Sequence, residues 1–184
     1  MFDTERFVED CRRAVAEDDN HKAVRELVAE AVSDPAGLAN TLGEPEHAGI
    51  DALYRGPDLT VINFTWAPWM SLRPHDHAMW AVIGIFSGRE DNVFWRRTET
   101  GIEAAGAHSM GIGDTTPLGR DIIHSVLNPI GKMTRAIHVY GGDFFEPPKP
   151  RRQWDHETLE EQPWDVENTK RVFAAAEARA AVVA

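Results

Sequence analysis

The stretch Pro74-His75-Asp76-His77 places two imidazoles two residues apart, between segments rich in strand-forming residues. Side chains alternate between the faces of a β-strand, so His75 and His77 are predicted to share one face while Asp76 points to the other. Histidine is a common metal ligand, so this pair supplies half of a metal site. Two ordinary strand histidines would give the same pattern, and further ligands must decide between these interpretations.

The segments around this stretch are short, rich in β-branched and aromatic residues, and separated by glycine, proline and asparagine. They span residues 59–66, the stretch after His75 to Phe86, and residues 92–97, 122–127 and 134–140. No helical pattern alternates with them, which excludes a parallel α/β sheet. The sequence therefore predicts an all-β sandwich or barrel.

Helical periodicity flanks this β region on both sides. Apolar residues recur at helical spacing over 7–15 and 24–32, and a last helix is predicted after Asp165. The 184 residues fit one domain. Its predicted parts are N-terminal helices (1–36), a β-barrel core (57–146), and a strap with a C-terminal helix (147–184).

Composition excludes several kinds of partner. The formal net charge of −11 argues against nucleic acid and against anionic membranes. No apolar run approaches the roughly 20 residues that span a bilayer, and the N-terminus lacks the features of a signal peptide. We therefore expect a cytoplasmic protein. The single cysteine, Cys11, is predicted to be a buried thiol.

Two more histidines lie in predicted strands. His124 lies within residues 122–127, and His138 lies within residues 134–140. In the latter segment Ala136, His138 and Tyr140 share one face. A face with histidine and tyrosine is a suitable wall for a small polar pocket.

These residues occur in two motifs that resemble those of the cupins. The first is His75-x-His77, three residues, Ala81, six residues and Gly88. The second runs from Gly111 to Asn128, with two extra residues before its histidine; its matching residues are Gly111, Pro117, Gly119, His124 and Asn128. The resemblance implies an all-β cupin double-stranded β-helix (jelly-roll) barrel with a metal inside it, with N-terminal and C-terminal α-helical extensions.

Ala81 stands where most cupins have a glutamate ligand, which leaves His75, His77 and His124 as the implied ligands. A three-histidine set resembles the thiol dioxygenases, meaning cysteine dioxygenase and its bacterial 3-mercaptopropionate dioxygenase relatives. The resemblance implies Fe²⁺, with Zn²⁺ or Ni²⁺ possible in the purified protein. It also implies a small thiol substrate and O₂ as partners, and a sulfinic acid as product.

The last predicted strand resembles the serine, histidine and tyrosine relay of the same family. Tyr140, held by His138, is implied to donate a hydrogen bond to the reacting groups. Ala136 replaces the relay serine, so water or a backbone group would have to orient His138. No cysteine follows His77, and we expect no thioether crosslink to Tyr140.

The residues that bind the substrate follow from the resemblance and from alternation. Arg55, in a Tyr-Arg pair before the barrel, is one candidate for binding the substrate carboxylate, and Arg151 or Arg152 is the other. Met79 and Ala81 continue the His77 face and are predicted to line the pocket.

Three functions remain open from the sequence. The first is an iron thiol dioxygenase. The second is another three-histidine cupin enzyme, either an iron dioxygenase that cleaves a C–C bond or a zinc hydrolase, because three histidines with an open position also suit zinc. The third is a non-enzymatic cupin that uses its metal to bind a ligand. A homodimer is compatible with each function.

Overall fold

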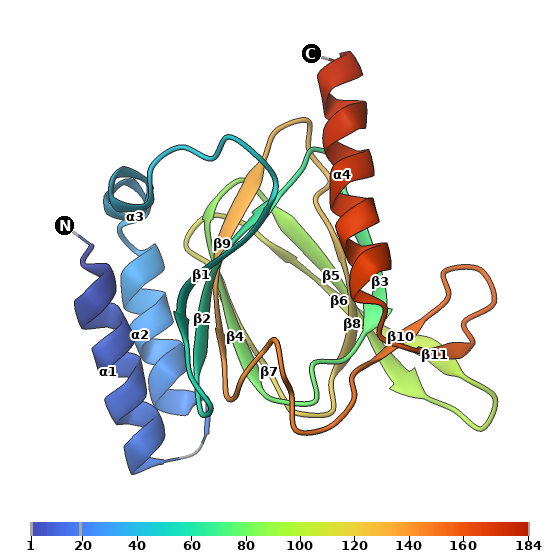
Figure 1. The fold of residues 1–184 in the computed structure, drawn as a ribbon, viewed down its shortest axis with the longest axis horizontal. Helices are drawn as coiled ribbons and strands as arrows, with labels where there is room; N and C mark the ends of the chain where they lie inside the picture. The colour runs from blue at the N-terminus through green and yellow to red at the C-terminus, as the bar shows by residue number, and fades with distance from the viewer. Residues whose placement is uncertain (1, 19, 184) are drawn as a thin grey trace.

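A computed structural model describes residues 2–18 and 20–183 of the chain (Figure 1). Within these residues, eleven strands form two sheets, and every strand pairing is antiparallel. The strands are β1 (Gly49–Arg55), β2 (Thr60–Trp66), β3 (Ser71–His75), β4 (Ala81–Ser87), β5 (Glu90–Arg97), β6 (Ile102–Met110), β7 (Thr115–Leu118), β8 (Ile123–Leu127), β9 (Thr134–Tyr140), β10 (Arg152–Trp154) and β11 (Glu161–Pro163).

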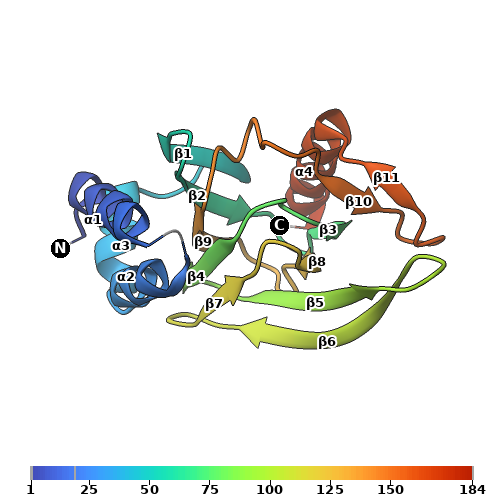
Figure 2. The same cartoon turned by 90° about the horizontal axis from the view of Figure 1, so that it is seen from below.

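The two sheets face each other and enclose one apolar core. The strand orders are β1-β2-β9-β4-β7 and β11-β10-β3-β8-β5-β6 (Figure 2). Ile62 and Ile83 of the first sheet pack in the same cluster as Leu72 and Val126 of the second. Consecutive strands alternate between the sheets over much of the barrel, as in a jelly roll. The predicted fold class is therefore confirmed, an all-β double-stranded β-helix with helices at both ends.

The helices are α1 (Thr4–Glu17), α2 (Lys22–Val32), α3 (Pro35–Leu42) and α4 (Val166–Val183). The first three cover the outer face of the first sheet, whereas α4 lies beside β3 and β10 (Figures 1 and 2). Val24 and Val28 of α2 pack against Val61 and Val139 of that outer face, and Cys11 is buried there as predicted. Both faces of β2 and β9 are thus covered, which explains why these strands are continuously buried.

Several elements differ from the sequence prediction. A third N-terminal helix, α3, was not predicted. The side chain of Asp34 accepts a hydrogen bond from the Gly37 N–H (2.9 Å), and Pro35 begins α3. Strands β1 and β6 were not predicted because most of their side chains are exposed and give no apolar alternation. No helix among the described residues is long and apolar enough to cross a membrane.

Candidate metal centre

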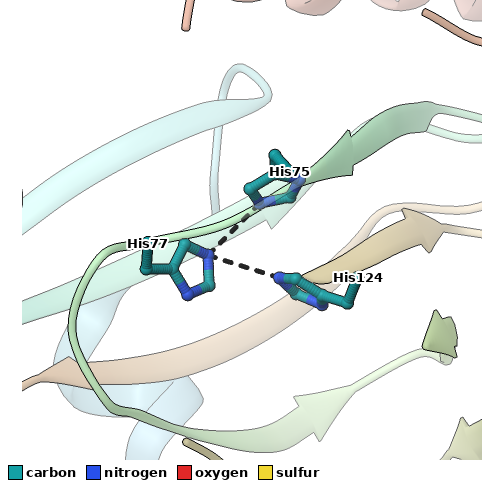
Figure 3. Close-up of side chains that lie close together, drawn as sticks. All are labelled: His75, His77 and His124. Atoms are coloured by element: carbon teal, nitrogen blue, oxygen red, sulfur yellow. Dashed lines mark hydrogen bonds between the residues drawn. The ribbon is translucent and has the colours of Figure 1, made fainter. Parts of the chain in front are cut away.

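The three predicted ligands converge inside the barrel (Figure 3). His75 ends β3, His77 lies in the loop that follows, and His124 comes from β8, where it pairs with His75. The Nε2 atom of His77 lies 3.2 Å from Nε2 of His75 and 3.3 Å from Nε2 of His124. All three rings are buried, and one ring nitrogen from each lies within 4.8 Å of the others.

The backbone around His75 and His77 differs from the single strand on which the prediction of this pair rested. β3 ends at His75, so His77 is not on a strand and does not share a strand face with it. The chain turns at Ala78, whose φ of 58° lies in the left-handed region. His77, the residue before this turn, reaches the cluster from an irregular segment, and the strand alternation does not continue past Ala78.

The second ring nitrogen of two histidines is fixed by a hydrogen bond. His75 Nδ1–H donates to the Arg73 carbonyl (2.9 Å), and His124 Nδ1–H donates to Asn92 Oδ1 (2.7 Å). Each bond selects the tautomer whose Nε2 carries a lone pair, as in most histidine ligands of metals. Metal–nitrogen bonds of about 2.0–2.1 Å place neighbouring ligand nitrogens about 2.9–3.4 Å apart. The donor set, and the spacing of His77 from His75 and from His124, therefore fit a divalent metal ion.

The electrostatics of the cluster favour neutral imidazoles. Burial lowers the pKa of His75 to about 4. Burial, with the neighbouring imidazoles, also holds the pKa values of His77 and His124 well below the ordinary value. All three rings are therefore uncharged at neutral pH, in the form that binds metals.

We expect the metal-free protein to lose stability as the pH falls from about 6.5 to 4. The unfolded chain takes up protons in this range that the folded cluster excludes, so the free energy of unfolding decreases. For His75 alone the shift from 6.5 to about 4 corresponds to about 3 kcal/mol. Chemical denaturation of the metal-free protein at several pH values in this range measures how the free energy of unfolding changes with pH. If this pH dependence is the same in a His75→Gln variant, His75 is not a source of it.

Tyr140 and His138 extend the site along β9. The Tyr140 hydroxyl and His138 Nδ1 are 2.9 Å apart, and the Tyr140 ring packs edge-on against His77 with centroids 5.1 Å apart. Burial raises the pKa of Tyr140, so its hydroxyl stays protonated. No described protein group hydrogen-bonds His138 Nε2. Instead, Oε2 of the buried Glu90 lies 3.9 Å from its Nε2.

Arg151 is a buried cation at the same site. Its side chain is 8% exposed and lies over the rings of Phe144 (4.5 Å) and Trp164 (4.8 Å). Its Nη1 atom has no hydrogen-bond partner among the described residues, and no ion pair of Arg151 is recorded there. Desolvation lowers the pKa of its guanidinium. An unpaired buried cation is a receptor for an anion.

A small cavity joins these groups. Its volume is about 30 Å³, roughly enough for one water molecule. Its polar lining comes from the three histidines, His138, Tyr140, Arg151 and Thr169. The apolar wall includes Trp164, before α4, and Phe173, on α4, which stacks on Trp66 at 5.7 Å. The C-terminal segment therefore covers the site.

Four other candidate residues, Arg55, Met79, Ala81 and Arg152, lie outside the cavity lining. Arg55 is partly exposed and its guanidinium pairs with Asp143 and Glu146, both at 2.9 Å. Met79 and Ala81 are buried in the core but do not line the cavity, because the turn at Ala78 ends the alternation on which they were chosen. The structure does not bring these side chains together with the histidines.

Sequence reasoning missed two polar groups that support the site. Glu90 and Asn92 alternate on one face of β5, and both are buried. A buried strand face with a carboxylate and an amide two residues apart is unusual, because such groups are expensive to bury without partners. That alternation was the available signal, but the partner His124 lies 32 residues away in sequence.

No family model matches the chain, and no curated protein sequence is significantly similar to it. A structure of an RmlC-like cupin family protein with a double-stranded β-helix fold from Methanocaldococcus jannaschii has a TM-score of 0.46 and 9% identity, over 55% of this chain and 86% of that chain. A double-stranded β-helix domain protein from Klebsiella pneumoniae has a TM-score of 0.45 and 10% identity, over 67% of this chain and 89% of that chain. Oxalate decarboxylase from Bacillus subtilis has a TM-score of 0.42 and 15% identity, over 53% of this chain and 24% of that chain. The fold assignment rests on the strand order itself.

Proposed function

We propose that the protein is a mononuclear iron dioxygenase that oxidises the thiol of a small thiol carboxylate to a sulfinic acid. In the balanced reaction, R–SH and O₂ give R–SO₂H, so both oxygen atoms end on sulfur. The observation that carries this proposal is the unpaired, buried guanidinium of Arg151 in the same small cavity as three neutral histidines. This pairing suits a ligand with an anion at one end and a metal-binding group at the other.

The protein groups have separate roles in this proposal. His75, His77 and His124 would hold Fe²⁺, which supplies the reaction between thiolate and dioxygen. Three neutral ligands leave the full 2+ charge of the ion, and this charge favours the thiolate over the thiol. Arg151 binds the carboxylate, and the hydrogen bond with His138 holds the Tyr140 hydroxyl at the cavity wall. The buried pocket keeps bulk water away from these groups.

The lining of the cavity favours a substrate without an ammonium group. None of the described side chains that line it is acidic, and its remaining wall is apolar or aromatic. A zwitterionic amino acid would bury its ammonium without an anionic partner, which is costly. We therefore propose 3-mercaptopropionate as a better substrate than cysteine. A cavity of about 30 Å³ is too small for either compound, so covering side chains such as Phe173 move when the substrate enters.

The test is oxygen consumption by protein prepared without oxygen and loaded with Fe²⁺. The compounds are 3-mercaptopropionate, cysteine, cysteamine and a diketone that has no thiol. We expect uptake and sulfinic acid formation with 3-mercaptopropionate, weaker uptake with cysteine and the least with cysteamine, which lacks a carboxylate. Uptake with the diketone and with no thiol would favour C–C cleavage. Protein that carries zinc and is inert to oxygen with every compound would favour the hydrolytic alternative.

A further inference from the structure

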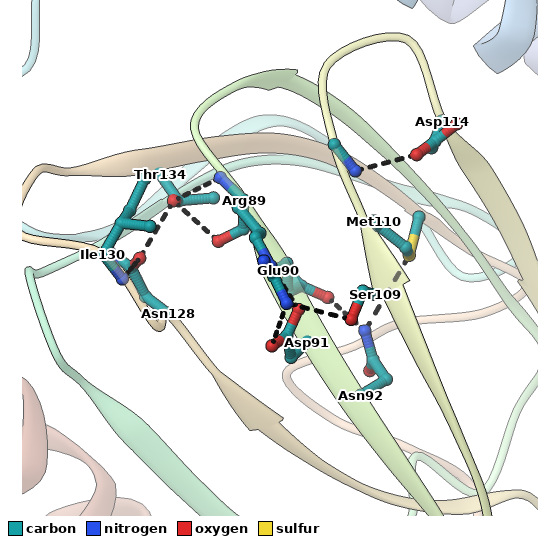
Figure 4. Close-up of polar contacts among 11 residues, drawn as sticks. Arg89, Glu90, Asp91, Asn92, Ser109, Met110, Asp114, Asn128, Ile130 and Thr134 are labelled. Atoms are coloured by element: carbon teal, nitrogen blue, oxygen red, sulfur yellow. Dashed lines mark hydrogen bonds and ion pairs between the residues drawn. The ribbon is translucent and has the colours of Figure 1, made fainter.

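The carboxylate of Glu90 is completely buried, and its side chain lies beside Asn92 on β5 (Figure 4). Its Oε2 accepts a hydrogen bond from the Trp66 indole N–H (2.8 Å), and its Oε1 accepts one from Asn92 Nδ2 (2.9 Å). Asn92 Oδ1 in turn accepts the hydrogen bond from His124 Nδ1–H (2.7 Å). A continuous chain of hydrogen bonds thus runs from Trp66 to His124.

The direction of every bond in this chain is set by Glu90. An ionised carboxylate can only accept, whereas an indole N–H can only donate. Asn92 must therefore turn its NH₂ group to Glu90 and its oxygen to His124. That oxygen requires a proton on His124 Nδ1, which leaves the lone pair on Nε2, the atom that faces His77.

We propose that Glu90 is a positioning residue that fixes His124, through Asn92, in the tautomer able to bind a metal. The inference rests on the metal site of the proposed function and does not depend on the reaction carried out there. Outer partners of this kind typically change metal affinity by about 10- to 100-fold when they are replaced.

Replacing Glu90 with glutamine should reverse the chain without breaking it. The introduced glutamine keeps its oxygen toward Trp66 and turns its NH₂ group to Asn92, whose side chain flips in response. The Asn92 NH₂ group then donates to His124 Nδ1, so the proton moves to Nε2. Every group remains paired in the metal-free protein, and metal binding must reverse the whole chain. The variant should therefore fold and bind metal more weakly.

A second substitution provides the rescue. In Glu90→Gln with Asn92→Asp, the glutamine NH₂ group donates to one aspartate oxygen, and the other aspartate oxygen accepts from His124 Nδ1–H. The bond directions at His124 are then those of the unmodified protein. Loss of packing at position 90 could not be restored in this way, so rescue separates positioning of His124 from a merely structural role.

The experiment measures Co²⁺ affinity of the metal-free full chain by its visible absorption, and the His124 tautomer by ¹⁵N NMR. We expect Glu90→Gln to weaken binding about 10- to 100-fold and to move the proton from Nδ1 to Nε2. The double variant should return to within about threefold of the unmodified affinity, with the proton back on Nδ1. Glu103→Gln, which removes an exposed carboxylate on β6, is the matched control and should change neither quantity.

Affinity within threefold of the unmodified protein for Glu90→Gln would overturn the inference. A folded double variant whose Co²⁺ affinity stays more than threefold below that of the unmodified protein would also overturn it. If Glu90→Gln does not fold, the comparison of the double variant with the unmodified protein decides alone. A chain that binds Co²⁺ normally but consumes no oxygen with thiols would contradict the proposed reaction and leave the role of Glu90 standing. An unmodified chain that binds no Co²⁺ would overturn the metal site and this inference together.

Discussion

Replacing Tyr140 with phenylalanine should lower turnover of the iron-loaded protein by about 10²–10³-fold, while the protein keeps its metal. The ring stays in place, because it packs against His77 and Phe144 and only the hydroxyl is removed. Burial raises the pKa of the Tyr140 hydroxyl, so this group stays protonated throughout the working pH range. The protonated hydroxyl can donate a hydrogen bond to the reacting oxygen atoms. Single donors of this kind contribute about 3–4 kcal/mol to the transition state.

Iron content and turnover must be measured on the same preparation, because loss of the hydroxyl also leaves His138 Nδ1 without its partner. That loss should cost about 1–3 kcal/mol of stability, which a denaturation curve detects separately. Tyr54→Phe is the matched control, since Tyr54 is the other tyrosine of the chain and packs with the outer helices. Unchanged turnover in Tyr140→Phe, with full iron, would remove Tyr140 from the reaction.

The fold was predictable where both faces of a strand are buried. β2 and β9 give continuous runs of apolar and aromatic residues, and these runs identify the centre of the first sheet. β6 could not be found in this way, because it pairs only with β5 at the sheet edge and leaves most of its side chains in solvent. Sequence patterns report burial, so an exposed strand gives little signal.

The site was predictable from residue types and spacing, but its local geometry was not. His75, His77 and His124 converge as expected, although His77 comes from the loop after β3 and not from a strand. The role of Glu90 depends on its contact with Trp66, which lies 24 residues away in the sequence, and on the contact of Asn92 with His124, which lies 32 residues from Asn92. Such contacts are set by how the two sheets pack, and a single sequence does not display them.

Replacing Arg151 with methionine should lower kcat/KM for 3-mercaptopropionate by about 10²–10³-fold. Turnover of an uncharged thiol without a carboxylate, such as 2-mercaptoethanol, should stay nearly unchanged. Truncating one partner of a buried charge pair typically costs about 2–5 kcal/mol. Methionine keeps most of the length of the side chain and its contacts with Phe144 and Trp164. The effect should therefore be confined to substrates that carry the anion.

The same substitution should raise the stability of the substrate-free protein, because burial without an anionic partner disfavours the charged guanidinium, as its lowered pKa shows. Arg152→Met is the matched control. The neighbouring Arg152 is partly exposed, and its Nε lies 3.5 Å from Glu161 Oε1. Its loss should therefore change neither kcat/KM for 3-mercaptopropionate nor the stability of the protein by much. An equal fall in kcat/KM for thiols with and without a carboxylate would mean that Arg151 supports the shape of the pocket instead of binding the anion. Higher stability together with selective loss of carboxylate substrates is the combination expected only of a cation held in place for its ligand.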